Sequence, residues 1–444
     1  KSMSNTETSI PEFLAKTATT MGGSSFRITN NKTSSTAAPS LYFKNDDDLY
    51  VSLALLNSCI SQVYMDLLNP TVGLKLANVE AVPAINFEKM AVFLRSSCEN
   101  NIALSKEDWD SYEISWDFEQ HPLVKRKELH SLEKCYLTWK TECENRFLKM
   151  KDNEEHINVV ILKEYGLENE VSCEVPEKSI SVHRIFDTKE DIPVSMDGSY
   201  YVRTKRDEIV SLISYSVGCM FGRYSLDKKG IVNAGAPLNV NEYVSFSVDK
   251  DNIIPICDDE YFKDDIVGRF VEFIKIVYGA DSLDDNLTFI AKALGGKGSP
   301  REIIRNYFVN DFYKEHCATY SGTVGKRPIY WLFDAGKNNS FKALIYMHRY
   351  QPDTIARIRT DYVHEQQARY RTAIADLEQR IANTSTGERV KLKKKLATLQ
   401  AQDTEIRTYE EKIHHLADQM ISINLDDGVK KNYAIFQDVL AKIK

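Results

Sequence analysis

The sequence has 444 residues, of which 43% are hydrophobic and 27% charged, and its net charge is −7. This composition is typical of a globular protein with two to four domains, and no apolar run approaches the ~20 residues that span a bilayer. The first residues contain no apolar signal core, and the eight cysteines form no Cys-x-x-Cys pair, so we expect a cytoplasmic protein without a zinc ribbon or redox motif.

The first predicted element is an amphipathic helix that begins near Asp46. Asp46 to Asp48 favour a helix start, because acids stabilise the exposed N–H groups there. Asn69-Pro70 ends the helix, because proline cannot continue the hydrogen-bond ladder. The apolar positions of this helix, at three- and four-residue steps, are Leu49, Leu53, Leu56, Ile60, Val63 and Leu67. Behind the stop, a short strand is predicted from the alternation of Val72, Leu74, Leu76 and Val79.

The middle of the chain divides into a helical part and a mixed part. Residues 99–168 are predicted to be helical, with apolar positions at Trp116, Leu132, Tyr136, Trp139, Cys143 and Phe147. Residues 169–352 are predicted to be α/β, with helices over Asp207–Cys219 and Asp264–Tyr278. Short strands are predicted around Ile180, Val182, Val194, 200–202 and 244–248.

The stretch from Asp353 to about Ile421 has a different pattern. Apolar residues keep a heptad-like spacing on both sides of the polar, glycine-containing loop 383–387, which predicts an antiparallel helical hairpin or coiled coil. Its charges are of both signs, which favours a solvated coiled coil over a dedicated DNA-binding arm. The alternative is phosphate contact by Lys391, Lys393, Lys394 and Lys395.

Four blocks of the sequence, in order, resemble the large adenine-specific DNA methyltransferases of BREX phage-exclusion systems (the PglX family) and the related single-chain restriction–methylation enzymes. The blocks are 53–83 (with Leu67-Leu68-Asn69-Pro70-Thr71), 108–123 (Asp108-Trp109-Asp110-Ser111-Tyr112-Glu113), 326–350 (Lys326-Arg327-Pro328-Ile329-Tyr330-Trp331) and 425–433 (Leu425-Asp426-Asp427-Gly428). The resemblance implies the C-terminal, DNA-recognising portion of such an enzyme. The expected partners are double-stranded DNA and an N-terminal methyltransferase region.

The predicted organisation is a helix-rich α+β fold in four segments. Residues 1–98 would be the C-terminal part of a target-recognition domain, 99–168 a helical spacer, 169–352 a mixed α/β domain, and 353–444 the helical hairpin and tail.

The catalytic motifs of the family are missing from this sequence. Adenine-N6 methyltransferases of this family bind the flipped adenine with an Asn/Asp-Pro-Pro-Tyr/Phe motif. None of the twelve prolines in this sequence is followed by another. The glycine cluster Gly295-Gly296-Lys297-Gly298 precedes Ser299-Pro300 and predicts a capped helix start rather than a cofactor loop, although such a start can also bind phosphate. S-adenosylmethionine is therefore expected for the intact enzyme and not for this chain. No metal or nucleophile constellation emerges, so we expect no catalysis by this chain alone.

Three sets of basic and small polar residues are candidates for contacts to DNA, because phosphate contacts position a protein and base-edge contacts specify the sequence. The net charge is no obstacle, since a local basic face is enough. The first set is Arg27, Asn30, Asn31, Lys32, Thr33 and Ser34. The second is Arg203, Lys205 and Arg206, followed by Arg223, Lys228 and Lys229. The third is Lys326, Arg327, Lys337, Lys342 and Arg349.

Two further expectations concern the biological setting. Because the numbering starts at Lys1 and the catalytic motifs are missing, the chain is expected to be a fragment or a C-terminal portion. A rival hypothesis is a protein-interaction scaffold, whose hairpin docks other BREX subunits or a phage-encoded inhibitor.

Overall fold

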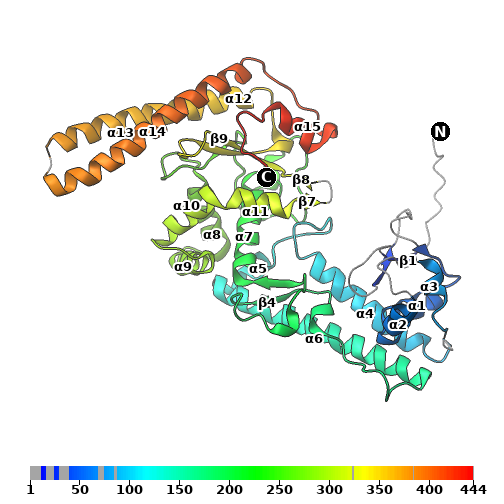
Figure 1. Ribbon diagram of the computed structural model, residues 1–444. Helices are drawn as coiled ribbons and strands as arrows, with labels where there is room; N and C mark the ends of the chain where they lie inside the picture. The colour runs from blue at the N-terminus through cyan, green and yellow to red at the C-terminus, as the bar shows by residue number, and fades with distance from the viewer. Residues whose placement is uncertain are drawn as a thin grey trace, which may run out of the picture. The chain divides into compact units, whose positions relative to one another are not determined.

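The computed structural model describes residues 12–16, 25–29, 40–68, 75–84, 88–322, 325–383 and 385–443. By compactness the chain forms two units (Figure 1). Unit 1 is Lys1–Trp109 with Lys140–Thr204, and unit 2 is Asp110–Trp139 with Lys205–Lys444. The fold is helix-rich α+β, as predicted. The four-segment division by function stays a prediction.

Unit 1 consists of two small sheets and a set of helices. In the first sheet the strand order is β2-β1-β3, all antiparallel, and in the second β4 and β5 pair in parallel. The strands are β1 (Phe13–Lys16), β2 (Phe26–Thr29), β3 (Ser40–Leu41), β4 (Arg184–Phe186) and β5 (Val202–Thr204). The helices are α1 (Asp46–Asn57), α2 (Cys59–Leu68), α3 (Leu76–Glu80), α4 (Ala91–Trp109) and α6 (Leu132–Tyr165), whose first turns belong to unit 2.

The single helix predicted from Asp46 to Leu67 is two helices. The start is as predicted, with Asn45 as the cap that accepts from the Asp48 N–H at 2.8 Å. At Ser58 the ladder breaks, because the Ser58 and Ser61 hydroxyls both donate to the Leu55 carbonyl. The Cys59 N–H donates instead to Asn158 Oδ1 of α6, at 3.0 Å. Within the described residues no single helix is long and apolar enough to cross a membrane; α1 and α2 reach that length only as a pair, bent by 69°.

Several predicted strands are wrong. Leu76–Glu80 is the helix α3, and Val72 and Leu74 lie outside the described residues. Residues 244–248 form no strand, and Val194 begins a 3-10 turn. Trp116 lies in the turns between α4 and α5 and is 92% exposed, so it is no core position of a helix. Alternation alone misled here, because short apolar runs do not distinguish strands from turns or helices.

Unit 2 consists of a small antiparallel sheet surrounded by helices, with two long helices at the C-terminal side. The strands are β6 (Ile254–Pro255), β7 (Ser321–Gly322), β8 (Gly325–Lys326), β9 (Tyr330–Asp334) and β10 (Lys342–Tyr346). The helices are α5 (Pro122–Lys125), α7 (Lys205–Met220), α8 (Ile266–Tyr278), α9 (Leu283–Leu294), α10 (Pro300–Asn310), α11 (Phe312–Thr319), α12 (Thr354–Arg357), α13 (His364–Ala382), α14 (Thr386–Ala417) and α15 (Gly428–Ile435). The helices predicted over 207–219 and 264–278 are thus confirmed as α7 and α8. The predicted cap is also confirmed: Ser299 and Glu302 form a capping box with Pro300 in the first turn of α10.

The core of unit 2 is the sheet β6-β10-β9 and the base of the two long helices. β9 and β10 pair antiparallel with Tyr330 opposite Tyr346, and β6 pairs with the other edge of β10. Trp331, Phe333 and Ile345 of the sheet belong to one buried cluster with Ile358 and Ile406 of the helices. Burying this many large apolar side chains holds the helices on the sheet.

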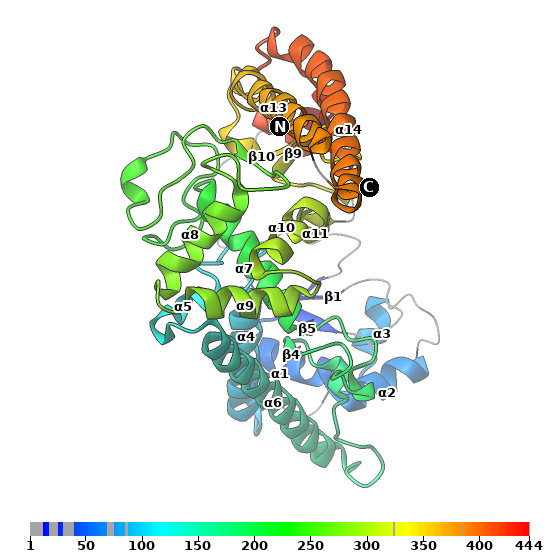
Figure 2. The same ribbon diagram turned by 90° about the vertical axis from the view of Figure 1, so that its left-hand side faces the viewer.

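The predicted helical hairpin is confirmed. α13 and α14 lie side by side and antiparallel, joined by a short connection (Figures 1 and 2). α13 follows a π-helical segment, Ile358–Val363, at the base of the hairpin. Whether the two helices interlock as a coiled coil stays a prediction.

Candidate nucleic-acid interface

Arg27 lies on β2, at the edge of the described three-stranded sheet of unit 1. Phe26 before it points into the core, so Arg27 points outward, as strand alternation requires. Asn57, the last residue of α1, holds β2 in place: its side chain accepts from the Phe26 N–H at 2.8 Å and donates to the Phe26 carbonyl at 3.1 Å. Arg27 is therefore an exposed cation on a fixed backbone. The other members of the first predicted set, Asn30 to Ser34, lie outside the described residues.

The second predicted set is engaged in contacts within the chain. Arg206 forms an ion pair with Glu315 at 2.8 Å. The Lys205 ammonium lies over the rings of Tyr136 and Phe289, 5.2 and 5.7 Å from their centroids. Arg203 is half-buried on β5. Of the residues that follow, Arg223 is buried against Tyr224 and Tyr346, and Lys228 and Lys229 pair with Glu242 and Glu119.

The third predicted set separates into an inner and an outer group. Lys342 is buried, and its ammonium donates to the Val309 carbonyl at 2.8 Å. Arg349 donates to the carbonyls of Phe221 and Asp249, at 3.2 and 2.9 Å, and burial lowers its pKa. Lys326 is half-exposed on β8, while Arg327 and Lys337 are exposed.

The loop that carries Lys337 is held against α14. Glu405 of α14 accepts from the backbone N–H groups of Asn338 and Ser340, at 2.9 and 3.1 Å. Gly336 has φ +144°, and a Cβ there would come within 2.7 Å of Glu405 Oε1. Glycine is therefore required for this close approach, and Lys337 sits on a fixed turn.

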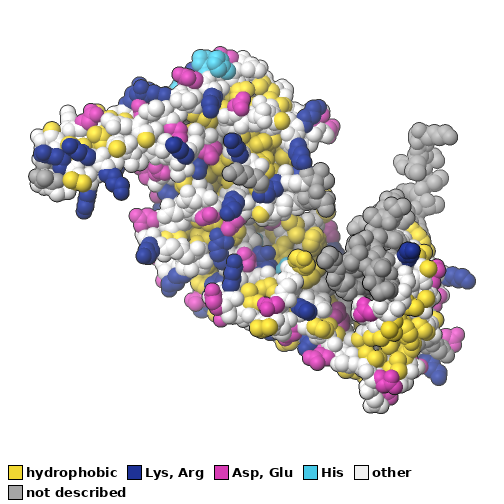
Figure 3. Space-filling view, viewed as in Figure 1, with side chains coloured by type: hydrophobic (Ala, Val, Ile, Leu, Met, Phe, Trp, Pro, Cys, Tyr) yellow, Lys and Arg dark blue, Asp and Glu magenta, His cyan; other side chains and the backbone are white. Residues whose placement is uncertain are grey.

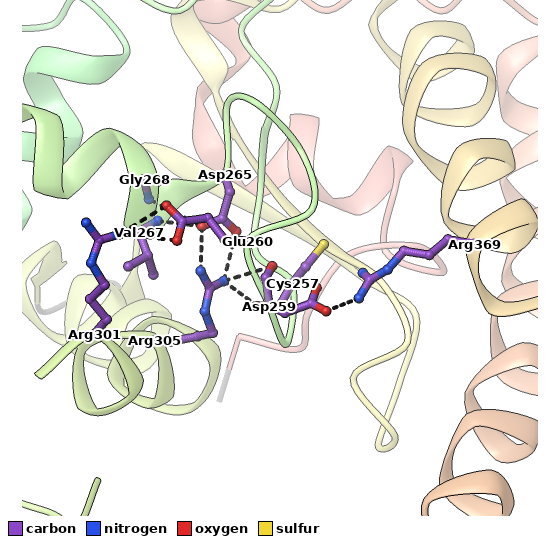
Figure 4. Close-up of polar contacts among 9 residues, drawn as sticks. All are labelled: Cys257, Asp259, Glu260, Asp265, Val267, Gly268, Arg301, Arg305 and Arg369. Carbon is purple, nitrogen blue, oxygen red and sulfur yellow. Dashed lines mark hydrogen bonds and ion pairs between the residues drawn. The ribbon is translucent and has the colours of Figure 1, made fainter. Parts of the chain in front are cut away.

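The loop from Cys257 to Asp265 connects α10 and α8 to α13 through arginines (Figure 4). Arg305 of α10 makes a two-pronged ion pair with Asp265 at 2.8 and 2.9 Å, and it also donates to the Cys257 carbonyl at 2.7 Å. The Asp265 carboxylate is 1% exposed and caps α8, where it accepts from the N–H groups of Val267 and Gly268. Arg369 of α13 pairs with Asp259 of the same loop. These contacts fix the base of the hairpin.

Buried tyrosines add to this anchoring. Tyr370 of α13 donates to the Ser340 carbonyl at 2.8 Å, and Tyr409 of α14 donates to the Val439 carbonyl at 2.9 Å. Tyr362, in the π-helical segment, donates to Asp264 at 2.6 Å and lies 2.9 Å from Asp251. The sequence pattern counted Tyr362 and Tyr409 as apolar positions of the hairpin, but it did not predict these hydrogen bonds, because the partners are far away along the chain.

Asp249, Asp251 and Asp264 form the group of acidic side chains that is closest to a metal-ligand set among the described residues, with carboxylate oxygens within 4.8 Å of one another. Burial and the neighbouring Asp251 raise the pKa of Asp249 to about 7, so this carboxyl holds a proton well above the usual range. The Tyr362 hydroxyl and Arg357, 3.4 Å from Asp251, supply further compensation. The group is thus explained as part of the hairpin anchor.

The end of the hairpin remote from the sheet has a different character. We call residues 378–399 the distal segment; it contains the end of α13, the connection and the first half of α14. Lys and Arg side chains gather on the hairpin at this end (Figure 3). Lys391, Lys393, Lys394 and Lys395 are all exposed, and the described residues provide no ion-pair partner for them.

No protein-family model matches the chain. Among curated proteins, it is 38% identical over 402 residues to the adenine-specific methyltransferase PglX of Lacticaseibacillus casei (strain Zhang), a match that covers 88% of this chain and 31% of that protein. It is 34% identical over 420 residues to the adenine-specific methyltransferase BrxX of Escherichia coli O9:H4 (strain HS), covering 91% of this chain and 34% of that protein. The chain spans about one third of the length of these relatives. Over about nine tenths of its own length, the chain is therefore homologous to part of the adenine-specific methyltransferases PglX and BrxX.

Proposed function

We propose that this chain is the DNA-recognising region of a BREX-type adenine-specific DNA methyltransferase. The observation that carries the proposal is the similarity to PglX and BrxX along nearly the whole chain, combined with a sequence that holds no Pro-Pro pair. The chain would select and position the duplex. A methyltransferase region outside it would bind S-adenosylmethionine and methylate a flipped adenine.

Exposed cations on fixed backbone support this role. In unit 1, Arg27 projects from a strand held at both backbone groups of Phe26. In unit 2, Lys337 lies on a turn fixed by Glu405. Arg327 is exposed in the connection between β8 and β9. Recognition of bases and phosphates requires cations whose positions are set before binding. Lys342 and Arg349 are left out of this set, because their donors are used inside unit 2.

Binding of the 444-residue chain to duplex DNA, measured by fluorescence anisotropy over a salt series, tests the proposal. We expect binding that weakens steeply with salt, because neutralising each phosphate releases counterions. Absence of duplex binding at low salt would contradict the proposal for this chain.

Specificity is tested in the intact methyltransferase. We expect Arg27→Ala, alone or with Lys32→Ala, to relax the methylated sequence, since one base contact contributes roughly 1–3 kcal/mol of discrimination. Sequencing of methylated host DNA reports the site choice. As a control, Lys44→Ala removes an exposed cation of unit 1 outside the predicted set and should leave the methylated sequence unchanged. An unchanged methylated sequence in the Arg27 variant would show that Arg27 does not contact bases.

A second candidate function is docking of a protein partner, such as another BREX subunit or a phage-encoded inhibitor. It is favoured by an open groove of about 390 Å³ between α13 and α14, lined by both signs of charge, including Arg371, Glu378, Asp403 and Arg407. Mixed charge and a partly apolar floor suit a polypeptide better than a phosphate backbone. Absence of duplex binding at every salt concentration of the series would favour this function over DNA recognition.

A further inference from the structure

We propose that the distal segment of the hairpin is a sequence-independent phosphate-binding arm, which grips duplex DNA through Lys391, Lys394 and Lys395. The proposal deepens the proposed function and rests on it. It assigns to the arm affinity without sequence preference, and leaves base reading to other residues.

Charge is segregated along the hairpin. The distal segment, residues 378–399, contains six basic and two acidic residues, a net charge of +4 in a protein whose net charge is −7. The second half of α14, residues 400–417, contains four acidic and two basic residues. The sequence pattern alone predicted a solvated face with charges of both signs. Residues 378–399 and residues 400–417, taken separately, have net charges of opposite sign.

This segregation is unfavourable for the helix itself. The cost does not come from the helix dipole, because the first turn of α14 holds the acid Glu388, the last turn holds His414 and His415, and the lysines lie beyond the first turn. Lys391 and Lys395, and likewise Arg389 and Lys393, are like charges at i, i+4, a spacing at which they repel each other. Helix stability therefore does not explain the arrangement, and local choices that oppose the fold are expected at functional sites.

The three lysines share one face of α14. Their spacing of i, i+3 and i+4 places them side by side, while Leu392 and Ile406 point to the interior of the hairpin. All three ammonium groups are free of ion pairs among the described residues, in contrast to Arg359, Arg369 and Arg407, which pair with acids near the base. Solvated, uncompensated cations are the groups that displace counterions from a phosphate backbone.

The arm is held rigidly at the other end. Ile406, Tyr409 and Ile413 of α14 are buried in the core of unit 2, and fourteen residues separate Ile406 from Leu392, about 21 Å at the helical rise. The anchored part continues through Gln402, which donates to the Asn338 carbonyl at 3.0 Å, to Leu399, which packs against the same core cluster. The lysine face therefore lies four to eight residues beyond the anchored part of the helix, roughly 6–12 Å. A rigid support of this kind limits the entropy lost on binding.

The chemistry of the face favours DNA over a protein partner. Protein interfaces are enriched in aromatic residues and depleted in lysine, whereas Val390 is the one large hydrophobic side chain exposed among the described residues of the distal segment. Lysine is a point charge with little directional demand, which suits phosphates rather than base edges.

The test is the salt dependence of duplex binding by the full 444-residue chain with Lys391→Gln, Lys394→Gln and Lys395→Gln combined. We expect affinity to fall roughly tenfold to a hundredfold at low salt and the slope of log K against log salt to drop by about 2–3, one phosphate contact for each lysine. The preference for one duplex sequence over another should not change. Circular dichroism should show undiminished helix, because the substitutions remove repulsion.

Two matched variants complete the design. Arginine at the same three positions keeps the charge and should keep the slope, whereas glutamine at Lys163, Lys178 and Lys189, three exposed lysines of unit 1, makes the same charge change elsewhere and should have little effect. An unchanged slope in the distal variant, with wild-type binding intact, overturns the arm and leaves the proposed function standing. Absence of wild-type binding overturns both. Polyglutamate serves as a probe for an acidic protein partner. If the distal glutamine variant loses the binding of polyglutamate seen with the wild type but binds duplex DNA as the wild type does, the DNA assignment is overturned in favour of an acidic protein.

Discussion

The two ends of the helical hairpin use charge in opposite ways. At the base, arginines and acids are paired with one another or with backbone groups, as in the contacts of Arg305 with Asp265 and of Glu405 with the 336–340 turn. In the distal segment, the four lysines 391, 393, 394 and 395 have no such partners among the described residues. The paired charges at the base stabilise the fold. The solvated lysines of the distal segment repel one another within their helix and are available to a ligand. The predictions below test this division, beginning with the largest expected effect.

The buried pair at the base should be essential for stability. We expect Asp265→Ala to lower the free energy of unfolding by about 3–5 kcal/mol, because it leaves the Arg305 guanidinium buried without its partner and removes the cap of α8. Urea unfolding followed by circular dichroism measures the loss. Asp265→Asn retains the capping oxygen and should lose less; a cost below about 1 kcal/mol for the alanine variant would show that the base does not depend on this pair.

The acidic group at the base should make stability depend on pH. The folded-state pKa of Asp249 is raised to about 7 from its usual 3.8 by burial and Asp251, so the folded protein holds a proton that the unfolded chain has released. The stability contributed by this proton is fully present below about pH 4 and is lost as pH rises through 7. Asp249→Asn removes the charge and keeps an acceptor for the Ile253 N–H, so it should stabilise the protein at pH 8 by roughly 1–3 kcal/mol.

Thermal unfolding at several pH values measures this effect. The gain in the Asp249→Asn variant should shrink steadily from pH 8 to pH 5. A gain that is constant with pH would assign it to packing rather than to the proton.

In the distal segment the sign of the effect on stability should be reversed. The combined glutamine substitutions at Lys391, Lys394 and Lys395 remove the repulsion of two like-charge pairs, Lys391 with Lys394 and Lys391 with Lys395. They should stabilise the first half of α14 by about 0.4–1 kcal/mol, roughly 0.2–0.5 kcal/mol for each pair. Amide hydrogen exchange of residues 388–399 should slow accordingly, while exchange at the base stays the same. Faster exchange would mean that the lysines have a structural role and would weaken the contrast between the two ends.

The smallest effect is expected for an exposed ion pair at the base. Arg301 and Glu260 lie 3.2 Å apart with about half of each side chain exposed. We expect Arg301→Ala to cost about 0.2–0.5 kcal/mol, because water screens such pairs. A cost comparable to that of Asp265→Ala would show that the arginines around the 257–265 loop act as one network rather than as separate pairs.

Local features were predictable from the sequence where neighbouring residues decide them. The hairpin follows from apolar spacing on two sides of a polar loop, and the start of α10 follows from Ser299, Pro300 and Glu302, which lie within one turn. The break at Ser58 was not predicted, because the local bonds of the Ser58 and Ser61 hydroxyls act together with a distant one, in which Asn158, 99 positions away, accepts from the Cys59 N–H. The strand predicted from Val72 to Val79 was wrong in the part that the structure describes, because a short apolar alternation also fits one turn of helix.

The candidate DNA contacts likewise depend on distant residues that the sequence pattern does not indicate. Residue type alone placed Lys342 and Arg349 beside Arg327 and Lys337 as equals. Packing separates them, since the carbonyls of Val309, Phe221 and Asp249 converge on the first two from distant parts of the chain. The lysines of α14 were visible in the sequence, but the contrast between a partnered base and a solvated distal segment was not.

By itself the sequence determined the kinship with adenine-specific methyltransferases, the helix-rich composition and the hairpin, because these depend on residue order and on spacing within a few turns. The tertiary structure decided which charges are engaged and which are solvated. The physical reason is that the state of a charge depends on burial and on partners brought together by folding, and these partners lie up to 144 positions apart here, as for Asp258 and Gln402.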